Sequence, residues 1–120
     1  MKNVKVSVII NCYNSDKYLK QAIDSVYAQS FSDWEIIFWD NQSTDKSKQI
    51  AQSYDHKLKY FYAPIHTNLG EARYNATKMA KGKYLAFLDS DDIWDKNKLK
   101  NQLNFMEKNN ILFSHTSYYV

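Results

Sequence analysis

Short apolar runs alternate with segments of helical periodicity along this 120-residue chain, and no other feature constrains its fold as strongly. Four of these runs predict strands: residues 4–10, 34–39, 58–63 and 84–88. The segments between and after them place apolar residues three to four positions apart and predict helices: about 15–27, 44–51, 68–81 and 95–108. This alternation predicts a single α/β domain with a mostly parallel, Rossmann-like sheet and helices on both of its faces.

Local signals predict where some of these helices begin and end. Asn68, with Glu71 three residues later, fits a capping box at the start of the third helix. Ser43 or Thr44 suits the start of the second helix. Gly82 suits the position just after the end of the third helix.

Polar clusters follow three of the expected strands: Asn11–Asn14, Asp40–Asp45 and Asp89–Asp92. The carboxyl ends of parallel strands lie at one edge of a sheet, and ligands bind outside that edge. We therefore expect Asn11, Asp40 and Asp89 at the same edge, next to a ligand.

Acidic residues crowd the stretch that follows the apolar run Tyr84–Leu88: Asp89, Asp91, Asp92 and Asp95. A bound cation, a basic ligand or a raised pKa would relieve their mutual repulsion. Mg²⁺ and Mn²⁺ prefer oxygen ligands, and Mg²⁺ is commonly held by one or two carboxylates together with phosphates. The stretch is therefore interpreted as a platform for a metal and phosphates. The alternative is that Asp92 or Asp95 caps the next helix and Asp89 is only solvated.

Composition excludes several other functions. The chain has only two glycines, so a dinucleotide fingerprint and a Walker A loop are both excluded. The acidic stretch lacks the glycine and the glutamate of an EF-hand loop, and the histidines are isolated. The net charge of +3 does not demand a nucleic-acid partner. The single cysteine, Cys12, excludes an intrachain disulfide, and no apolar run reaches the length of a membrane span. We expect a cytoplasmic protein.

A nucleotide held without a glycine loop is the remaining hypothesis. Asp40 could accept a hydrogen bond from a base N–H, and Tyr13 could stack on the base. Arg73 could donate to the phosphates, and Asp91 could hold the metal that bridges them. Each residue also has a simpler interpretation, since Asp40 could begin a turn, Tyr13 could belong to the core, and Arg73 could pair with the acidic cluster.

The chain resembles the family-two nucleotide-sugar glycosyltransferases of the GT-A fold. The resemblance rests on four ordered stretches: Val6–Asn14, Trp39–Asp45, Asn68–Asn75 and Leu88–Asp92. It implies a metal-dependent transfer of sugar from a donor such as a UDP-sugar, with Mg²⁺ or Mn²⁺ as cofactor. It also implies a glycan or lipid-linked acceptor, as in the synthesis of cell-surface polysaccharide.

The resemblance also assigns roles to residues. The residue that matches Asp40 contacts the base, the one that matches Tyr13 packs on it, and the one that matches Arg73 lies near the phosphates. The triplet Asp89-Ser90-Asp91 matches the DxD motif, which implies Asp89 near the ribose and Asp91 on the metal. The implied nucleotide-binding residues are Asn11, Tyr13, Asp40, Arg73, Asp89 and Ser90, and the implied metal ligands are Asp91 and Asp89.

The chain departs from the family pattern in composition and in length. Asn11 replaces the usual proline, and Asp40-Asn41-Gln42-Ser43 replaces Asp-Asp-Gly-Ser. Family members are longer, with the acceptor site and general base after the DxD strand. We therefore expect residues 1–120 to form the donor-binding part of a longer enzyme, located in the cytoplasm or at the membrane surface, and to bind the donor without transferring it. The uncharged apolar residues in 111–120 predict self-association, or a disordered tail, in place of a clean monomer.

Two rival functions come from other classes. A receiver-like, Mg²⁺-binding signalling domain would need acidic residues after the first strand, where this chain has Asn11-Cys12-Tyr13-Asn14. A nucleotide-binding module without enzymatic activity would share all the features of the donor site. Only the activity of a longer chain would distinguish that module from the enzyme.

Overall fold

Four parallel strands form the sheet of the computed structural model, which describes residues 4–109. The strands are β1 (Val6–Cys12), β2 (Trp34–Asp40), β3 (Leu58–Tyr62) and β4 (Tyr84–Phe87). Their order in the sheet is β3-β2-β1-β4. The apolar segment expected over residues 111–120 lies outside the described residues.

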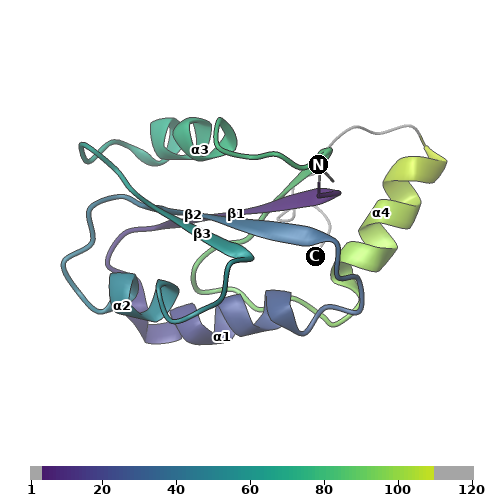
Figure 1. Ribbon diagram of the computed structural model, residues 1–120, viewed down its shortest axis with the longest axis horizontal. Coiled ribbons are helices and arrows are strands. Elements are labelled where there is room, and N and C mark those ends of the chain that lie inside the picture. The colour runs from purple at the N-terminus through teal and green to yellow at the C-terminus, as the bar shows by residue number, and fades with distance from the viewer. Residues whose placement is uncertain (1–3, 110–120) are drawn as a thin grey trace.

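Helices cover both faces of this sheet (Figure 1). The helices are α1 (Asp16–Tyr27), α2 (Ser47–Ala51), α3 (Leu69–Thr77) and α4 (Lys98–Lys108). Helix α3 lies on one face, and α1 and α2 lie on the other (Figure 1). The predicted α/β fold, with a parallel sheet between helices, is confirmed.

Two apolar cores explain why the strands are apolar on both faces. On the α1 face, Ile10 and Phe38 of the sheet belong to the same buried cluster as Leu19 and Ile23 of α1. The core on the α3 face is smaller, because α3 contributes only the small side chains of Ala72 and Ala76. The narrow apolar face of α3 therefore brings this helix close to β1 and β2.

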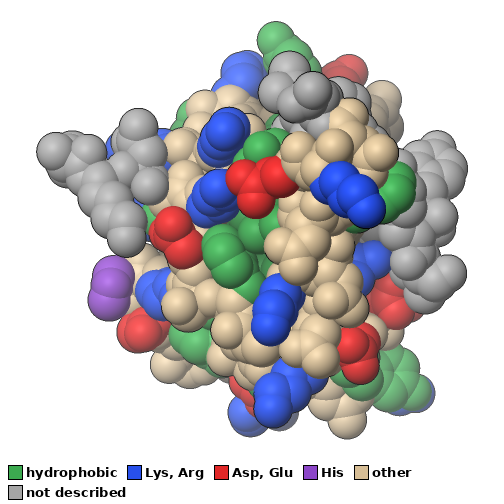
Figure 2. All heavy atoms as spheres, turned by 90° about the vertical axis from the view of Figure 1, so that its right-hand side faces the viewer, with side chains coloured by type: hydrophobic (Ala, Val, Ile, Leu, Met, Phe, Trp, Pro, Cys, Tyr) green, Lys and Arg blue, Asp and Glu red, His purple; other side chains and the backbone are tan. Residues whose placement is uncertain are grey.

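Helix α4 stands where the strands begin, since the Nζ of Lys5, just before β1, lies 2.7 Å from the Oε2 of Glu107. Figure 2 views the molecule from this side, and it shows basic and acidic side chains interspersed around a hollow lined by hydrophobic ones. Neither sign of charge dominates this face. None of the helices within residues 4–109 is long and apolar enough to cross a membrane.

The third helix ends earlier than predicted, and Gly82 has a different role. Helix α3 ends at Thr77, and no glycine among the described residues has a positive φ. The N–H of Gly82 instead donates to the Ser7 hydroxyl at 2.8 Å, and a Cβ on Gly82 would lie 2.5 Å from the Ser7 nitrogen. Gly82 is therefore required by close approach to β1, and the prediction of a helix-ending glycine was wrong.

Of the other predicted helix starts, one is confirmed and two lie later in the chain than predicted. The capping role of Asn68 is confirmed, because its side chain accepts the Glu71 N–H at 2.8 Å. Helix α2 begins at Ser47, whose N–H donates to Asp45 at 2.9 Å, so neither Ser43 nor Thr44 caps it. Helix α4 begins at Lys98, three residues later than predicted.

Candidate nucleotide-binding site

The carboxyl ends of β1 and β4 and the first turns of α3 enclose a cavity of about 460 Å³. Every predicted site residue except Asp40 lines it: Asn11, Tyr13, Arg73, Asp89, Ser90 and Asp91. The parallel register, with Ile9 opposite Phe87, brings the loops after β1 and β4 to the same edge. The expected convergence of polar clusters at this edge is confirmed.

The acidic loop after β4 is a turn with its carboxylates toward solvent. Leu88 still donates to Ile9 O at 3.0 Å, and Asp92 N–H then donates back to Asp89 O at 3.0 Å. Asp89, Asp91 and Asp92 are all exposed. Each carboxylate is therefore reachable by a ligand or by an ion.

Arg73 projects from α3 toward this loop. Its guanidinium lies 3.6 Å from the Asp89 carboxylate, with the two side chains 34% and 60% exposed. A pair with this exposure contributes only about 0–1 kcal/mol to stability, so its contact can be exchanged for a phosphate without a large loss. Both interpretations of Arg73, as a partner of the acidic cluster and as a phosphate donor, are compatible with this position.

The acidic loop fits a metal ion only if waters and phosphates supply the remaining ligands. Within residues 4–109 no group of three or more His, Cys, Asp or Glu side chains could hold a metal ion alone. Mg²⁺ in phosphate-binding sites is commonly held by one or two carboxylates, with waters and phosphates as the other ligands. Exposed Asp89 and Asp91 in one cavity fit this arrangement.

Tyr13 stands at the surface, so its interpretation as a core residue is wrong. Its side chain is 52% exposed, and its ring lies edge-on to that of His66, with 4.5 Å between centroids. The next residue, Asn14, has φ 47° and accepts the Thr44 N–H at 2.7 Å. The loop after β2 thus holds the loop that presents Tyr13.

Asp40 lies beneath the site rather than in its wall. It is fully buried, and its carboxylate accepts the Ser43 N–H at 2.8 Å and the Tyr60 hydroxyl at 2.5 Å. Burial, and then the hydrogen bond to Asp40, raise the pKa of Tyr60. Asp40 begins the turn after β2, as the simpler interpretation held. A contact with a base stays a prediction for this residue.

Asn11 has a side-chain donor, its Nδ2, without a partner among the described residues. Its Nδ2 is buried and makes no hydrogen bond with the part of the chain that the structure describes. The same is true of the Trp39 Nε1, directly opposite Asn11 in the register of β1 and β2. Buried donors are usually satisfied, so Asn11 is suited to a ligand that offers an acceptor.

Sequence reasoning missed a second cavity beside the first. This cavity, of about 270 Å³, shares Asn11, Tyr13 and Leu69 with the first, and Asn41 and His66 form its far side. Asn41 was recognised only as a departure from the family pattern, and His66 only as an isolated histidine. No local sequence pattern predicts that either residue lines a cavity, because the two meet through contacts between the loop after β2 and the loop before α3.

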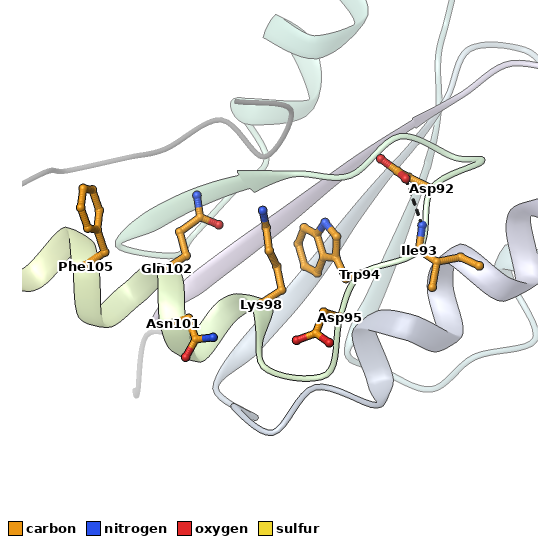
Figure 3. Close-up of a pocket in the computed structure, with 8 residues that line it drawn as sticks. All are labelled: Asp92, Ile93, Trp94, Asp95, Lys98, Asn101, Gln102 and Phe105. Atoms are coloured by element: carbon orange, nitrogen blue, oxygen red, sulfur yellow. Dashed lines mark hydrogen bonds between the residues drawn. The ribbon is translucent and has the colours of Figure 1, made fainter. Parts of the chain in front are cut away.

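A third cavity, of about 500 Å³, lies between residues 92–95 and α4. Lys98, Gln102 and Phe105 project from one side of α4, with Trp94 beside Lys98 (Figure 3). Both polar atoms of the Gln102 amide are buried and without a partner among the described residues. None of the predicted nucleotide-binding residues lines this cavity, so it is not part of the candidate donor site.

The fold is that of the GT-A glycosyltransferases. The chain belongs to glycosyl transferase family 2, whose family model matches residues 7–120. It is 41% identical over 116 residues to the putative teichuronic acid biosynthesis glycosyltransferase TuaG of Bacillus subtilis, covering 94% of this chain and 46% of TuaG. It is 36% identical over 119 residues to WfgD of Escherichia coli, a UDP-Glc:alpha-D-GlcNAc-diphosphoundecaprenol beta-1,3-glucosyltransferase, covering 98% of this chain and 47% of WfgD.

Solved structures agree with this assignment. The S. aureus TarS 1–349 complex with UDP-GlcNAc has a TM-score of 0.81 and 35% identity, covering 87% of this chain and 31% of that one. The mannosyltransferase PcManGT from Pyrobaculum calidifontis, solved with GDP-Man and Mn²⁺, has a TM-score of 0.77 at 22% identity and covers 88% of this chain and 33% of that one, so it shows only a shared fold. The chain spans from 17% to 47% of the length of the curated relatives compared.

Proposed function

We propose that this chain is the donor-binding part of a family 2 glycosyltransferase and that it holds a UDP-sugar in the 460 Å³ cavity with Mg²⁺ or Mn²⁺. One observation carries the proposal. Residues from three distant segments, predicted from sequence to bind nucleotide and metal, line this single cavity at the carboxyl edge of a parallel sheet. The similarity to TarS, whose structure includes UDP-GlcNAc, supports the choice of donor.

The nucleoside end of the donor is assigned to the loops after β1 and β2. Tyr13 packs on the base, and the Asn11 Nδ2 donates to an acceptor oxygen of the nucleoside. Asp40 accepts from a base N–H. Asp40 is fully buried and does not line the cavity, so this contact requires the turn after β2 to move.

The diphosphate end is assigned to α3 and the acidic loop. Arg73 exchanges its contact with Asp89 for the phosphates, and Ser90 and Asp89 approach the ribose. Asp91 and Asp89 are the proposed metal ligands. A bound divalent cation would offset the charge of the diphosphate as it leaves. Because three exposed carboxylates would otherwise repel the diphosphate, donor binding is expected to depend on that cation.

Transfer of the sugar is proposed to need residues beyond 120. The family resemblance implies that the acceptor site and the general base follow the DxD strand. WfgD and WfaP are named as enzymes acting on a diphosphoundecaprenol-linked sugar, and this supports a glycan or lipid-linked acceptor and a place at the cytoplasmic membrane surface. A receiver-like domain is excluded by the family assignment, whereas a module that binds nucleotide without catalysis remains the second candidate.

Calorimetry on the 120-residue chain tests the proposal. UDP is expected to bind in the presence of Mn²⁺ and to lose its affinity in EDTA, and GDP is expected to bind less tightly. Equal UDP affinity with and without EDTA would refute the metal's role. A sugar-nucleotide turnover assay on a longer chain separates the enzyme from the non-enzymatic module.

A further inference from the structure

The side chain of Asn41, in the loop after β2, makes two hydrogen bonds to the loop before α3. Its Nδ2 donates to Thr67 O at 2.7 Å, and its Oδ1 accepts the Thr67 N–H at 3.0 Å. Asn41 is only 6% exposed, so both bonds are shielded from water. The arrangement needs a side chain that donates and accepts at once. An asparagine does both, and an ionised aspartate can only accept.

The same loop also fixes His66. The His66 Nδ1 lies 2.9 Å from the backbone oxygen of Asn41. Because a carbonyl oxygen only accepts, Nδ1 carries the proton and donates it. This bond and the paired bonds to Thr67 hold consecutive residues of the loop before α3.

His66 in turn supports Tyr13. The two rings meet edge-on, with 62° between their planes and 4.5 Å between their centroids. Edge-to-face pairs of this kind are favourable for aromatic rings. Tyr13 is half-exposed, and without His66 its ring would be free to take other rotamers.

We infer that Asn41 and His66 are positioning residues for the nucleobase, acting through the orientation of the Tyr13 ring. This inference rests on the proposed function, which assigns Tyr13 to the base. Holding a ring in place before a ligand arrives removes an ordering cost that the ligand would otherwise bear. The contribution of this clamp, defined here as Asn41, Thr67 and His66, should therefore appear only with ligands that contain a base.

Two variants with matched controls separate this role from a structural one. Asn41→Asp keeps the size of the side chain and removes the donor to Thr67, and Asn104→Asp makes the same change at an exposed position of α4. His66→Ala removes an exposed ring, and His56→Ala removes another exposed histidine. Because His66 is exposed, His66→Ala is expected to fold even if Asn41→Asp does not.

The readout compares UDP with inorganic pyrophosphate, both measured by calorimetry with Mn²⁺. Asn41→Asp and His66→Ala are expected to weaken UDP roughly threefold to tenfold, the amount that ordering one side chain costs, and to leave pyrophosphate unchanged. His66→Phe keeps a ring beside Tyr13 and is expected to restore part of the loss. Equal losses for both ligands, or no loss for UDP, would overturn the inference.

A ligand-free measurement keeps this test independent of the proposed function. In the parent chain we expect NMR cross-relaxation between the ring protons of Tyr13 and His66, and we expect it to be lost in Asn41→Asp. If that signal persists in the variant, the clamp does not exist. If the signal is lost as expected but the parent chain fails to bind UDP, the proposed function fails while the clamp stands.

Discussion

The position of Asp40 in the fold could be predicted from the sequence, but its buried environment could not. Its place after β2 follows from the pattern of apolar runs. Its burial does not, because the Tyr60 hydroxyl that covers it comes from the neighbouring strand β3. A substitution at this position is therefore expected to change stability as well as any contact with a ligand, and each variant needs both measurements.

Asp40→Ala should weaken uridine binding and also destabilise the fold. Removing the carboxylate leaves the Ser43 N–H and the Tyr60 hydroxyl without an acceptor, which costs about 1–3 kcal/mol for each buried group that stays unpaired. Urea unfolding measures the stability, and calorimetry with uridine measures the base contact. Tyr60→Phe is the control, because it removes one partner and keeps the carboxylate. Equal uridine affinity in Asp40→Ala and the parent would refute the base contact.

Asp91→Asn should reduce Mn²⁺-dependent UDP binding most among the acidic residues of this loop. Loss of a direct ligand is expected to lower affinity at least roughly tenfold, since outer-shell partners alone contribute that much. Uridine without phosphates should bind as it does to the parent. Asp92→Asn, a nearby exposed carboxylate that lies outside the donor cavity, serves as the matched control. A larger effect in Asp92→Asn would move the metal away from Asp91.

At the scale of elements, Gly82 and Gly70 offer a contrast within one chain. A Cβ on Gly82 would lie 2.5 Å from the Ser7 nitrogen, whereas one on Gly70 meets nothing closer than 3.5 Å. We expect Gly82→Ala to lower the free energy of unfolding by about 1–3 kcal/mol through overpacking against β1. Gly70→Ala, inside α3, should instead raise it by roughly 0.5–1 kcal/mol. Urea titrations of both variants check the direction of each change in stability. An unchanged free energy of unfolding in Gly82→Ala would show that the backbone around Gly82 and Ser7 shifts to accommodate the methyl group.

Glu35, near the start of β2, contacts Ser7 of β1 and Lys81 beside Gly82. Its ionisation should make stability depend on pH. Burial opposes its ionisation, but hydrogen bonds from the Ser7 hydroxyl, the Lys81 N–H and the Lys59 ammonium together lower its pKa. A carboxyl with a lowered folded-state pKa contributes stability above its unfolded pKa and loses it as pH falls through the folded value. Urea unfolding across the acid range should therefore show a flatter pH dependence in Glu35→Gln than in the parent. Parallel curves would contradict this role.

The elements themselves could be predicted from sequence, and their ends could not. Strand and helix periodicity identified every element within residues 4–109. The start of α2 was displaced because an expected cap serves another segment, since Ser43 accepts the Asn14 N–H at 2.9 Å. Such contacts join residues about 30 positions apart, and no local pattern encodes them. The clamp formed by Asn41, Thr67 and His66 escaped prediction for the same reason.

At the scale of the whole molecule, we expect the purified chain to self-associate. Residues 111–119 contain no Asp, Glu, Lys or Arg, and they include Phe113, Tyr118 and Tyr119. Apolar segments of this kind pair with other molecules when nothing covers them. Light scattering should show species larger than a monomer, and a chain that ends at Asn109 should scatter as a monomer. A monodisperse full chain would refute this prediction.

The strand order β3-β2-β1-β4 also decides when the donor cavity can exist. The first strand made lies in the middle of the sheet, and its second neighbour, β4, is the last to be made of the four strands within residues 4–109. During synthesis the N-terminal part of the chain leaves the ribosome first. Strands β1, β2 and β3 can therefore pair before β4 is available to pair with the free edge of β1. Arg73 in α3 is made before β4, and the acidic loop is made after it. The pairing of β4 with β1 is non-local and therefore slow. The nascent protein can thus pair its first three strands before it gains the acidic loop that is proposed to bind the metal.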